Sequence, residues 1–164
     1  MAWSTPTTRT AGYTVPHTEW NQNVVDNPQA IYDAHAWTDV AFSAGNFTSD
    51  SGSWTVASGD VDYFAYRVLN KTMSISFRIV GSTVSGSPNQ LRIAIPASAT
   101  SAGGPTTICR AIDNGTDRFG VLSTAIGFQY VYILAISFAT ATNVTWANAT
   151  DTTSVWGQIE IEIA

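Results

Sequence analysis

The chain contains few charged residues, one cysteine, two histidines and no long hydrophobic run. Its 164 residues include seven Lys and Arg residues, and its formal net charge is −5 at pH 7. A nucleic-acid surface needs clustered basic side chains to neutralise phosphates, so this composition disfavours nucleic-acid binding. No apolar run approaches the roughly 18 residues that a transmembrane helix needs, so membrane insertion is not expected.

The scarcity of cysteine and histidine disfavours metal and redox chemistry. Cys109 has no partner for an intrachain disulfide, and we interpret it as a small buried residue of a strand. His17 and His35 have no Cys, Asp or Glu at the spacing of a metal site, so both are expected at the surface. We therefore predict no cofactor and no metal.

The start of the chain lacks the charged and then apolar pattern of a secretory signal. We therefore expect the protein to be assembled in the cytoplasm of the cell that makes it. Five Asn-x-Ser/Thr triplets occur, and without a secretion signal we attribute them to the abundance of Asn and Thr in turns.

Hydrophobic residues make up 45% of the chain and charged residues only 12%, about half the usual share. Low charge weakens the repulsion that keeps proteins monomeric, so we expect an assembly whose interfaces cover much of the surface. The alternative is a Ser/Thr-rich surface that stays soluble through hydrogen bonds alone.

The length suits one domain with an appendage, and we divide the chain into residues 1–36 and residues 37–164. In the first part Pro16 suits a first helical position. Trp20, Val24 and Ile31 then fall near one helix face, and Asn27-Pro28 indicates a stop after about three turns. Such a short helix is marginal alone, so its Trp20 face must dock on the chain's own sheet or on another subunit.

The second part has the period of two that is typical of strands. Apolar and polar residues alternate in Met73–Ile79, Leu91–Ile95 and Gln158–Ile163. Clusters of Gly, Ser, Asn and Pro separate the runs at the spacing of a sandwich or barrel. We predict a mainly β fold, a jelly-roll-like β-sandwich of about 8 to 10 strands, preceded by an extended arm and one short helix.

Two tight turns are expected within this domain. Asn70-Lys71 suits a two-residue hairpin, and Asp113-Asn114-Gly115-Thr116-Asp117 has the strongest turn signal in the chain. The second segment also resembles part of a calcium loop, but it lacks the later Glu and its Gly falls too early. We therefore interpret it as a turn.

The segment Tyr130–Phe138 is apolar on both faces, which indicates a strand covered on both sides. One face meets the core, and the other needs the helix or a neighbouring subunit. We favour a subunit contact near a threefold axis, with Tyr130 and Tyr132 as interface or ligand aromatics.

The sequence offers no convincing catalytic constellation. Asp60 and Asp62 would point to one side of a strand, as paired carboxylates of a glycosidase would, but Ser58-Gly59-Asp60 indicates an ordinary turn. Nucleophile elbows, phosphate loops and dinucleotide fingerprints are missing. We therefore predict that the protein is not an enzyme.

Aromatic residues are the remaining candidates for contact with a sugar or a subunit. Trp146 lies in a Thr-, Ala- and Asn-rich segment, residues 139–153, that reads as a loop, which suggests a contact at a tip. Core packing is the commoner fate of Trp and remains the alternative. The candidates of this kind are Trp3, Trp37, Trp54, Trp146, Trp156, Tyr63 and Tyr66.

The segment from Arg9 to Asn27 resembles an N-terminal module of tailed-bacteriophage structural proteins. The matching residues are Arg9-Thr10, Gly12, Trp20-Asn21 and Val24-Val25-Asp26-Asn27. Ala11 and Val25 depart from the pattern, which has an aromatic residue and an Arg at these places. The resemblance covers about the first thirty residues, and the remainder resembles the small β domains that follow this module.

The resemblance implies a virion structural protein on the particle surface, and it does not imply catalysis. We assign attachment to Trp3, Arg9, Tyr13, Trp20, Val24, Asp26 and Asn27. We expect a homotrimeric β domain that acts as a tail or head fibre or in host contact, with other virion proteins and a host surface glycan as partners. The alternative is a capsid decoration, or cement, protein. A glycan-binding or glycan-cleaving virion module is the third possibility.

Overall fold

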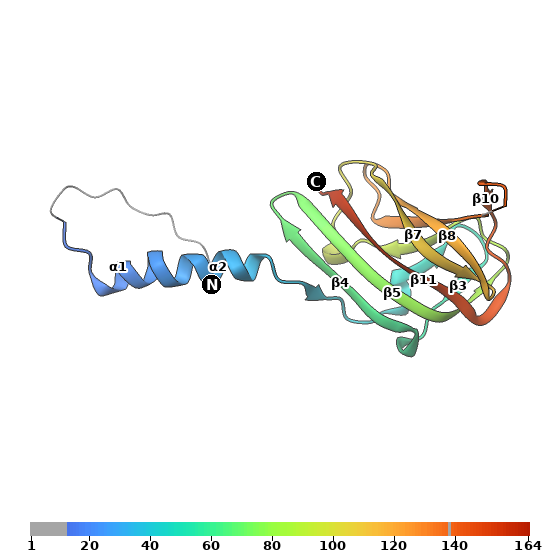
Figure 1. Ribbon diagram of the computed structural model, residues 1–164, viewed down its shortest axis with the longest axis horizontal. Helices are drawn as coiled ribbons and strands as arrows, with labels where there is room; N and C mark the ends of the chain where they lie inside the picture. Colours follow the sequence, from blue (N-terminus) through green and yellow to red (C-terminus); the bar gives the residue numbers. More distant parts are fainter. Residues whose placement is uncertain (1–12, 138) are drawn as a thin grey trace.

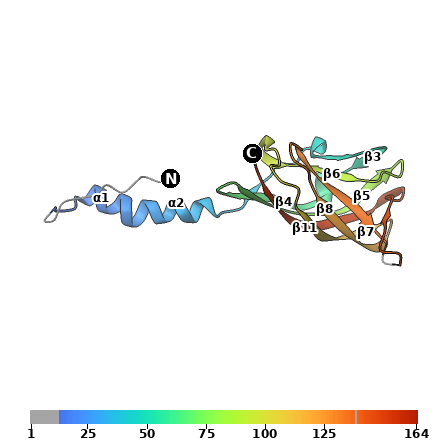
Figure 2. The same cartoon turned by 90° about the horizontal axis from the view of Figure 1, so that it is seen from above.

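The structure is a computed structural model that describes residues 13–137 and 139–164. A helix projects from one end of a β domain (Figures 1 and 2). The prediction of a mainly β fold preceded by a helix is confirmed. Trp3 and Arg9, to which the sequence assigns attachment, lie outside the described residues.

The helix runs through three consecutive segments: α1 (His17–Asn21), the π-helical η1 (Gln22–Asp26) and α2 (Asn27–Ala34). The predicted stop at Asn27-Pro28 is therefore wrong. In a straight α-helix the Pro28 ring would collide with the carbonyl four residues earlier. Here the wider π turn precedes Pro28, and the Asn27 N–H donates to the Gln22 carbonyl five residues back. The helix can therefore continue through the proline.

The described part of the chain forms one antiparallel sheet of eleven strands. Its order is β1-β4-β5-β11-β7-β8-β9-β6-β2, while β10 pairs with β9 and β3 pairs with β5. The strands are β1 (Thr38–Asp39), β2 (Phe47–Ser49), β3 (Ser53–Thr55), β4 (Val61–Leu69), β5 (Thr72–Ser85), β6 (Leu91–Ala94), β7 (Thr106–Asp113), β8 (Thr116–Ser123), β9 (Tyr130–Ile136), β10 (Asn143–Val144) and β11 (Ala149–Glu162). Short 3-10 turns are η2 (Ala44–Asn46), η3 (Ser58–Asp60) and η4 (Pro96–Ser98).

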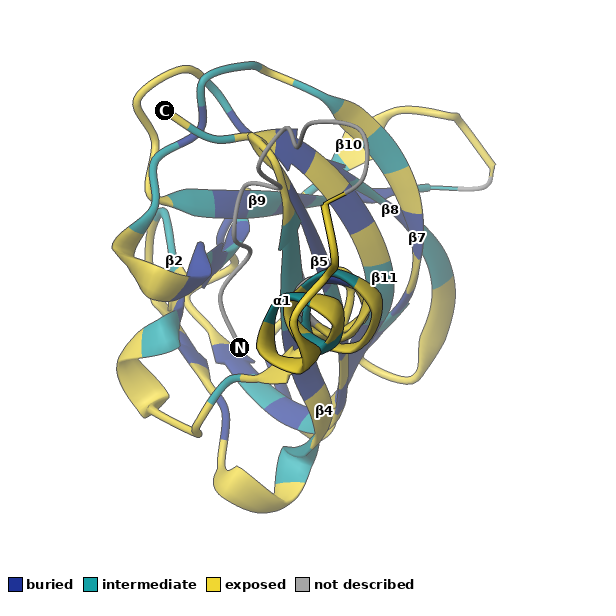
Figure 3. Cartoon of the chain, turned by 90° about the vertical axis from the view of Figure 1, so that its left-hand side faces the viewer, coloured by how far each residue is buried: buried dark blue, intermediate teal, exposed yellow. Residues whose placement is uncertain are grey.

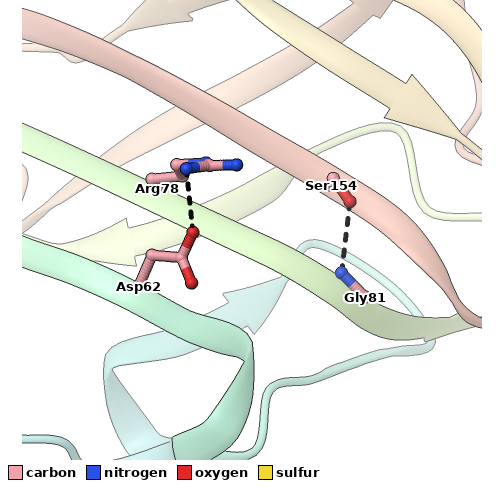
Figure 4. Close-up of polar contacts among 4 residues, drawn as sticks. All are labelled: Asp62, Arg78, Gly81 and Ser154. Atoms are coloured by element: carbon pink, nitrogen blue, oxygen red, sulfur yellow. Dashed lines mark hydrogen bonds and ion pairs between the residues drawn. The ribbon is translucent and has the colours of Figure 1, made fainter.

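This sheet differs from the predicted jelly-roll sandwich, which has two separate sheets. The strands are hydrogen-bonded continuously, and the sheet curls strongly into a half-barrel (Figure 1). The pairing register of the long strands β5 and β11 shifts beside Thr153, and such a bulge bends a sheet locally. At this bulge Gly81 has a φ of 77°, and its N–H donates to Ser154 Oγ at 3.1 Å (Figure 4).

Both predicted tight turns are present. Asn70-Lys71 joins β4 to β5, and Asn70 has a φ of 56°. Asn114 and Gly115 join β7 to β8 with φ values of 48° and 75°, as a type I′ hairpin requires. Asp113 is buried, accepts the Ala147 N–H at 2.8 Å and lies 3.8 Å from Arg118. These contacts support the turn interpretation over the calcium loop.

The core fills the concave side of the curled sheet. Met73, Ile75, Phe77 and Ile79 of β5 are buried, as their alternation with polar residues predicts. Trp54 and Trp146 are also buried, with 4% and 0% of their surface exposed. The Trp54 Nε1–H donates to Ser82 Oγ at 2.9 Å, and the Trp146 Nε1–H donates to the Ile133 carbonyl at 3.3 Å. Two large polar aromatics are thus packed with their N–H groups satisfied.

Candidate attachment and docking surfaces

The apolar side chains of the projecting helix lie open to solvent. Trp20 is 56% exposed and Tyr32 is 74% exposed, while Val24, Val25 and Ile31 are about half exposed. The Trp20 face therefore does not dock on the chain's own described sheet. Asn27 is different, because it is buried, and its Nδ2–H donates to Asn23 Oδ1 at 3.4 Å. Tyr13 donates its hydroxyl to Glu19 Oε2 at 2.9 Å.

The β domain has two unlike ends. The end opposite the helix, which we call the far end, is made of residues 50–52, 85–90, 113–116, 139–142 and 147–152. Hydrogen bonds join these segments: Asp50 Oδ1 accepts the Asn89 N–H at 3.0 Å, and Asn148 Oδ1 accepts the Ser87 N–H at 3.1 Å. Apart from the buried Pro88, the side chains of these segments are small or polar. The described far end thus offers no apolar contact surface.

The helix-side end consists of the β4–β5 turn, residues 100–103 and residues 124–129. Backbone bonds hold it together, because the Lys71 carbonyl accepts the Ile163 N–H at 2.8 Å and the Phe128 carbonyl accepts the Ser101 N–H at 2.9 Å. Exposed apolar side chains are found at this end and at Trp37, where the helix joins the sheet. They are Trp37 (40% exposed), Leu69 (46%), Ile126 (75%) and Phe128 (38%). Figure 3 looks onto this end along the helix.

The outer face of the sheet carries a second apolar surface. Register places Arg78, Trp156, Arg110 and Phe119 in one row across β5, β11, β7 and β8. The Arg110 guanidinium lies 4.6 Å from the centre of the Trp156 ring, a cation–π distance. In the neighbouring row Ile108 pairs with Val121, and Ile108 is 73% exposed.

An open groove of about 610 Å³ lies beside the first row and is bordered by Ile108 of the second. Its lining includes Ile108, Arg110, Phe119, Trp156 and the backbone of Gly157. The charges beside it are paired, since Arg110 lies 3.2 Å from Asp117, and Arg78 lies 3.1 Å from Asp62 (Figure 4). The groove is therefore mainly an apolar surface. Trp156 was one of the aromatic candidates, whereas Ile108 was missed, although its alternation with the inward Cys109 and Ala111 indicates an outward position.

Cys109 lies beneath this groove, on the concave side of the sheet. Burial raises the pKa of its thiol to about 12, although the Gly120 backbone N–H opposes the shift. The thiol is therefore protonated at neutral pH and is a poor nucleophile. The interpretation of Cys109 as a buried strand residue is confirmed.

The structure places two of the aromatic candidates, Trp54 and Trp146, in the core. A buried side chain does not contact a ligand, so the tip-contact prediction for Trp146 is wrong, and Trp54 is also a core residue. Tyr130 and Tyr132 lie half-buried on the outer face of β9. Arg92 and Phe128 partly cover the Tyr130 ring at 4.7 and 4.9 Å. A subunit contact at Tyr130 and Tyr132 stays a prediction.

The two carboxylates considered for catalysis have separate structural partners. Asp60 Oδ2 accepts the Ala57 N–H at 2.8 Å, and Asp62 pairs with Arg78. Among the described residues no cluster of His, Cys, Asp and Glu has the arrangement of a metal site. Within the same residues, no helix has both the length and the apolar character to cross a membrane.

Comparisons with models of known protein families, with curated proteins and with solved structures found no match to this chain.

Proposed function

We propose that this chain is a non-enzymatic structural protein of a tailed-bacteriophage particle, held there by its N-terminal arm and helix. The β domain then lies on the particle surface. The observation that carries the proposal is the set of apolar side chains along a helix that leaves its own domain. The sequence resemblance of the same segment to a phage attachment module supports it.

The energetics favour a partner for this helix. Trp20, Val24, Val25, Ile31 and Tyr32 each keep about half or more of their surface exposed. Covering what remains contributes on the order of 1 kcal/mol for each side chain. A helix of this length is marginal in water without such cover. Docking on another protein would therefore stabilise the helix and fix the β domain at the same time.

The side chains of the far end distinguish between two structural roles, a host-contacting fibre and a capsid decoration protein. A host-contacting fibre is expected to present aromatic or apolar side chains at its tip, whereas a decoration protein needs none. The described far-end segments carry small and polar side chains, and Trp146 is in the core. These observations favour capsid decoration over a glycan-contacting fibre tip.

The proposed oligomer is a homotrimer that uses the outer face of the sheet. The row of Ile108 and Val121 continues into Leu134 of β9, which is the strand that the sequence placed in a subunit contact. Ile108 is the most exposed of the three. A neighbouring copy would cover this patch, and the paired Arg and Asp residues beside it would lie at the rim.

The test is the incorporation of variants into particles. Trp20→Ala should reduce incorporation at least tenfold while the β domain stays folded, because this side chain lies mostly in solvent in the free chain. Phe42→Ala is the matched control, since Phe42 is an exposed aromatic of the β1–β2 connection and belongs neither to the helix nor to the outer-face rows. Quantitative mass spectrometry of purified particles measures both. Normal incorporation of Trp20→Ala would refute attachment through the helix.

Localisation separates the two roles. Immunogold labelling or cryo-EM of intact particles should show regular density over the head for a decoration protein, and sparse or tail-restricted density for a fibre. Sedimentation of the purified protein should give the mass of a trimer. Absence of the chain from particles would refute both roles.

A further inference from the structure

We propose that the helix-side end of the β domain is a second part of the attachment surface, continuous with the helix. The partner we infer is a different particle protein, one that offers an apolar surface with Lys and Arg side chains where it faces the helix. This inference rests on the proposed function and adds to it the orientation of the domain and the chemistry of its partner.

The first argument is the contrast between the two ends of the domain. Leu69, Ile126 and Phe128 are exposed at the helix-side end, and Trp37 is exposed where the helix joins the sheet. The described far-end segments have no counterpart to these side chains. Apolar side chains that gather at one end of a domain indicate a contact surface there.

The second argument is the set of contacts that connects the helix to this end. Three residues after α2, Trp37 stacks under the Arg67 guanidinium at 5.0 Å. The next residues, Thr38 and Asp39, pair with β4, which leads directly to Leu69. The helix is thus connected directly to β4, and β4 ends at the exposed Leu69. A partner that binds the helix along its length therefore meets this end of the domain.

The third argument is charge, and it selects the partner. The described helix carries Glu19, Asp26 and Asp33 and no Lys or Arg, and no Lys or Arg occurs from position 13 to position 66. The first Lys and Arg side chains after the helix, Arg67 and Lys71, belong to β4 and the β4–β5 turn, so the charge complementarity concerns the helix. Two such helices side by side would bring like charges together, which disfavours a second copy of this chain as the occupant. A partner surface of apolar side chains bordered by Lys and Arg would complement both the exposed apolar side chains and the carboxylates of the helix.

The chain provides its own probe for this orientation. Lys71 is its only lysine, and it is exposed in the β4–β5 turn at the helix-side end. Acylation by N-hydroxysuccinimide acetate, followed by peptide mass spectrometry, measures the accessibility of the Lys71 amine in the free protein and in particles. Ser51→Lys is the matched control, because Ser51 is exposed at the far end.

We expect the Lys71 amine to react at least tenfold more slowly in particles than in the free protein. The amine in the Ser51→Lys variant should react equally in both. Equal reaction of Lys71 in both states, with the chain present in particles, would overturn the orientation and leave the proposed function standing. Absence of the chain from particles would overturn the proposed function and this inference together.

The charge argument has its own test. The combined variant Glu19→Gln, Asp26→Asn and Asp33→Asn keeps the helix polar but neutral, and we expect its incorporation into particles to fall at least fivefold. Asp60→Asn with Asp151→Asn removes two carboxylates that have local partners outside both proposed surfaces, Ala57 and Thr83, and should incorporate normally. Equal incorporation of the two variants would overturn a basic partner surface. Circular dichroism of the free proteins verifies that both variants fold.

Discussion

Cys109 of β7 packs closely against Gly120 of β8 and Gly157 of β11. A Cβ atom at Gly120 would lie 2.5 Å from Cys109 Sγ, and a Cβ atom at Gly157 would lie 2.6 Å from Cys109 Cβ. Real Cβ atoms do not approach so closely, so both positions need glycine for steric reasons. The two glycines press on different atoms of the same side chain. This difference makes their effects separable.

Gly120→Ala should destabilise the fold by about 1–3 kcal/mol, because it overpacks the core. Replacing the thiol in Cys109→Ala should remove most of that cost, since the colliding atom is Sγ. The same replacement should not relieve Gly157→Ala, which meets the Cβ atom that alanine retains. Urea unfolding of the single and double variants measures these free energies.

Gly59→Ala serves as the control for this series, because open space surrounds the position. Its free energy of unfolding in urea should stay within about 0.5 kcal/mol of that of the original protein. Equal effects of Cys109→Ala on Gly120→Ala and Gly157→Ala would contradict the packing described here.

Trp146 contributes to stability through burial. Trp146→Ala should lower the free energy of unfolding by about 3–5 kcal/mol, because it empties a core site and leaves the Ile133 carbonyl without its donor. Trp20→Ala, at an exposed position, should change it by less than about 0.5 kcal/mol. Denaturant unfolding compares the two. Similar midpoints for both variants would contradict the core position of Trp146.

At the scale of elements, local patterns predicted the strands better than the way in which they assemble. The alternation in Met73–Ile79 and in Gln158–Ile163 reports which face is buried, and the structure confirms it. The curled sheet includes a bulge between β5 and β11, whose paired residues lie far apart in sequence. Local periodicity carries no information about such pairing.

The two largest errors of the sequence-based predictions, the helix stop at Pro28 and the tip position of Trp146, have similar causes. Pro28 is a stop signal in an α-helix, but one π turn ahead of it removes the clash, and nothing in the local residue types announces that turn. Trp146 lies in a segment whose composition is that of a loop, yet a loop can fold its Trp back over the core. The composition of this segment predicts an irregular backbone, but it does not predict the direction in which the Trp146 side chain points.

The bulge at Gly81 can be tested through its backbone angle. Gly81→Ala should destabilise the protein by about 1–2 kcal/mol, because a side chain is strained at a φ of 77° while the space around it is sufficient. Gly81→Asn should cost less, since Asn tolerates the left-handed region better. Thermal unfolding ranks the two. An Asn variant less stable than the Ala variant would contradict backbone strain as the cause.

For the whole molecule, the β domain carries its own core. The buried apolar cluster spans Phe47 to Ile161, and the described residues before Trp37 add nothing to it. Deleting residues 1–36 should therefore leave a folded β domain whose Tm lies within about 4 °C of the full chain. Circular dichroism and differential scanning calorimetry measure this. An unfolded product would show that the first part of the chain belongs to the core.

The Asn114-Gly115 turn has a practical consequence for engineering. It is a two-residue hairpin connection at the far end, its residues are exposed, and its strands β7 and β8 lie in the middle of the sheet. Short insertions are tolerated best at exposed turns of this kind. If the domain sits on a particle by its opposite end, a peptide epitope inserted between Asn114 and Gly115 would be presented outward in many copies. The same protein would then serve as a display scaffold.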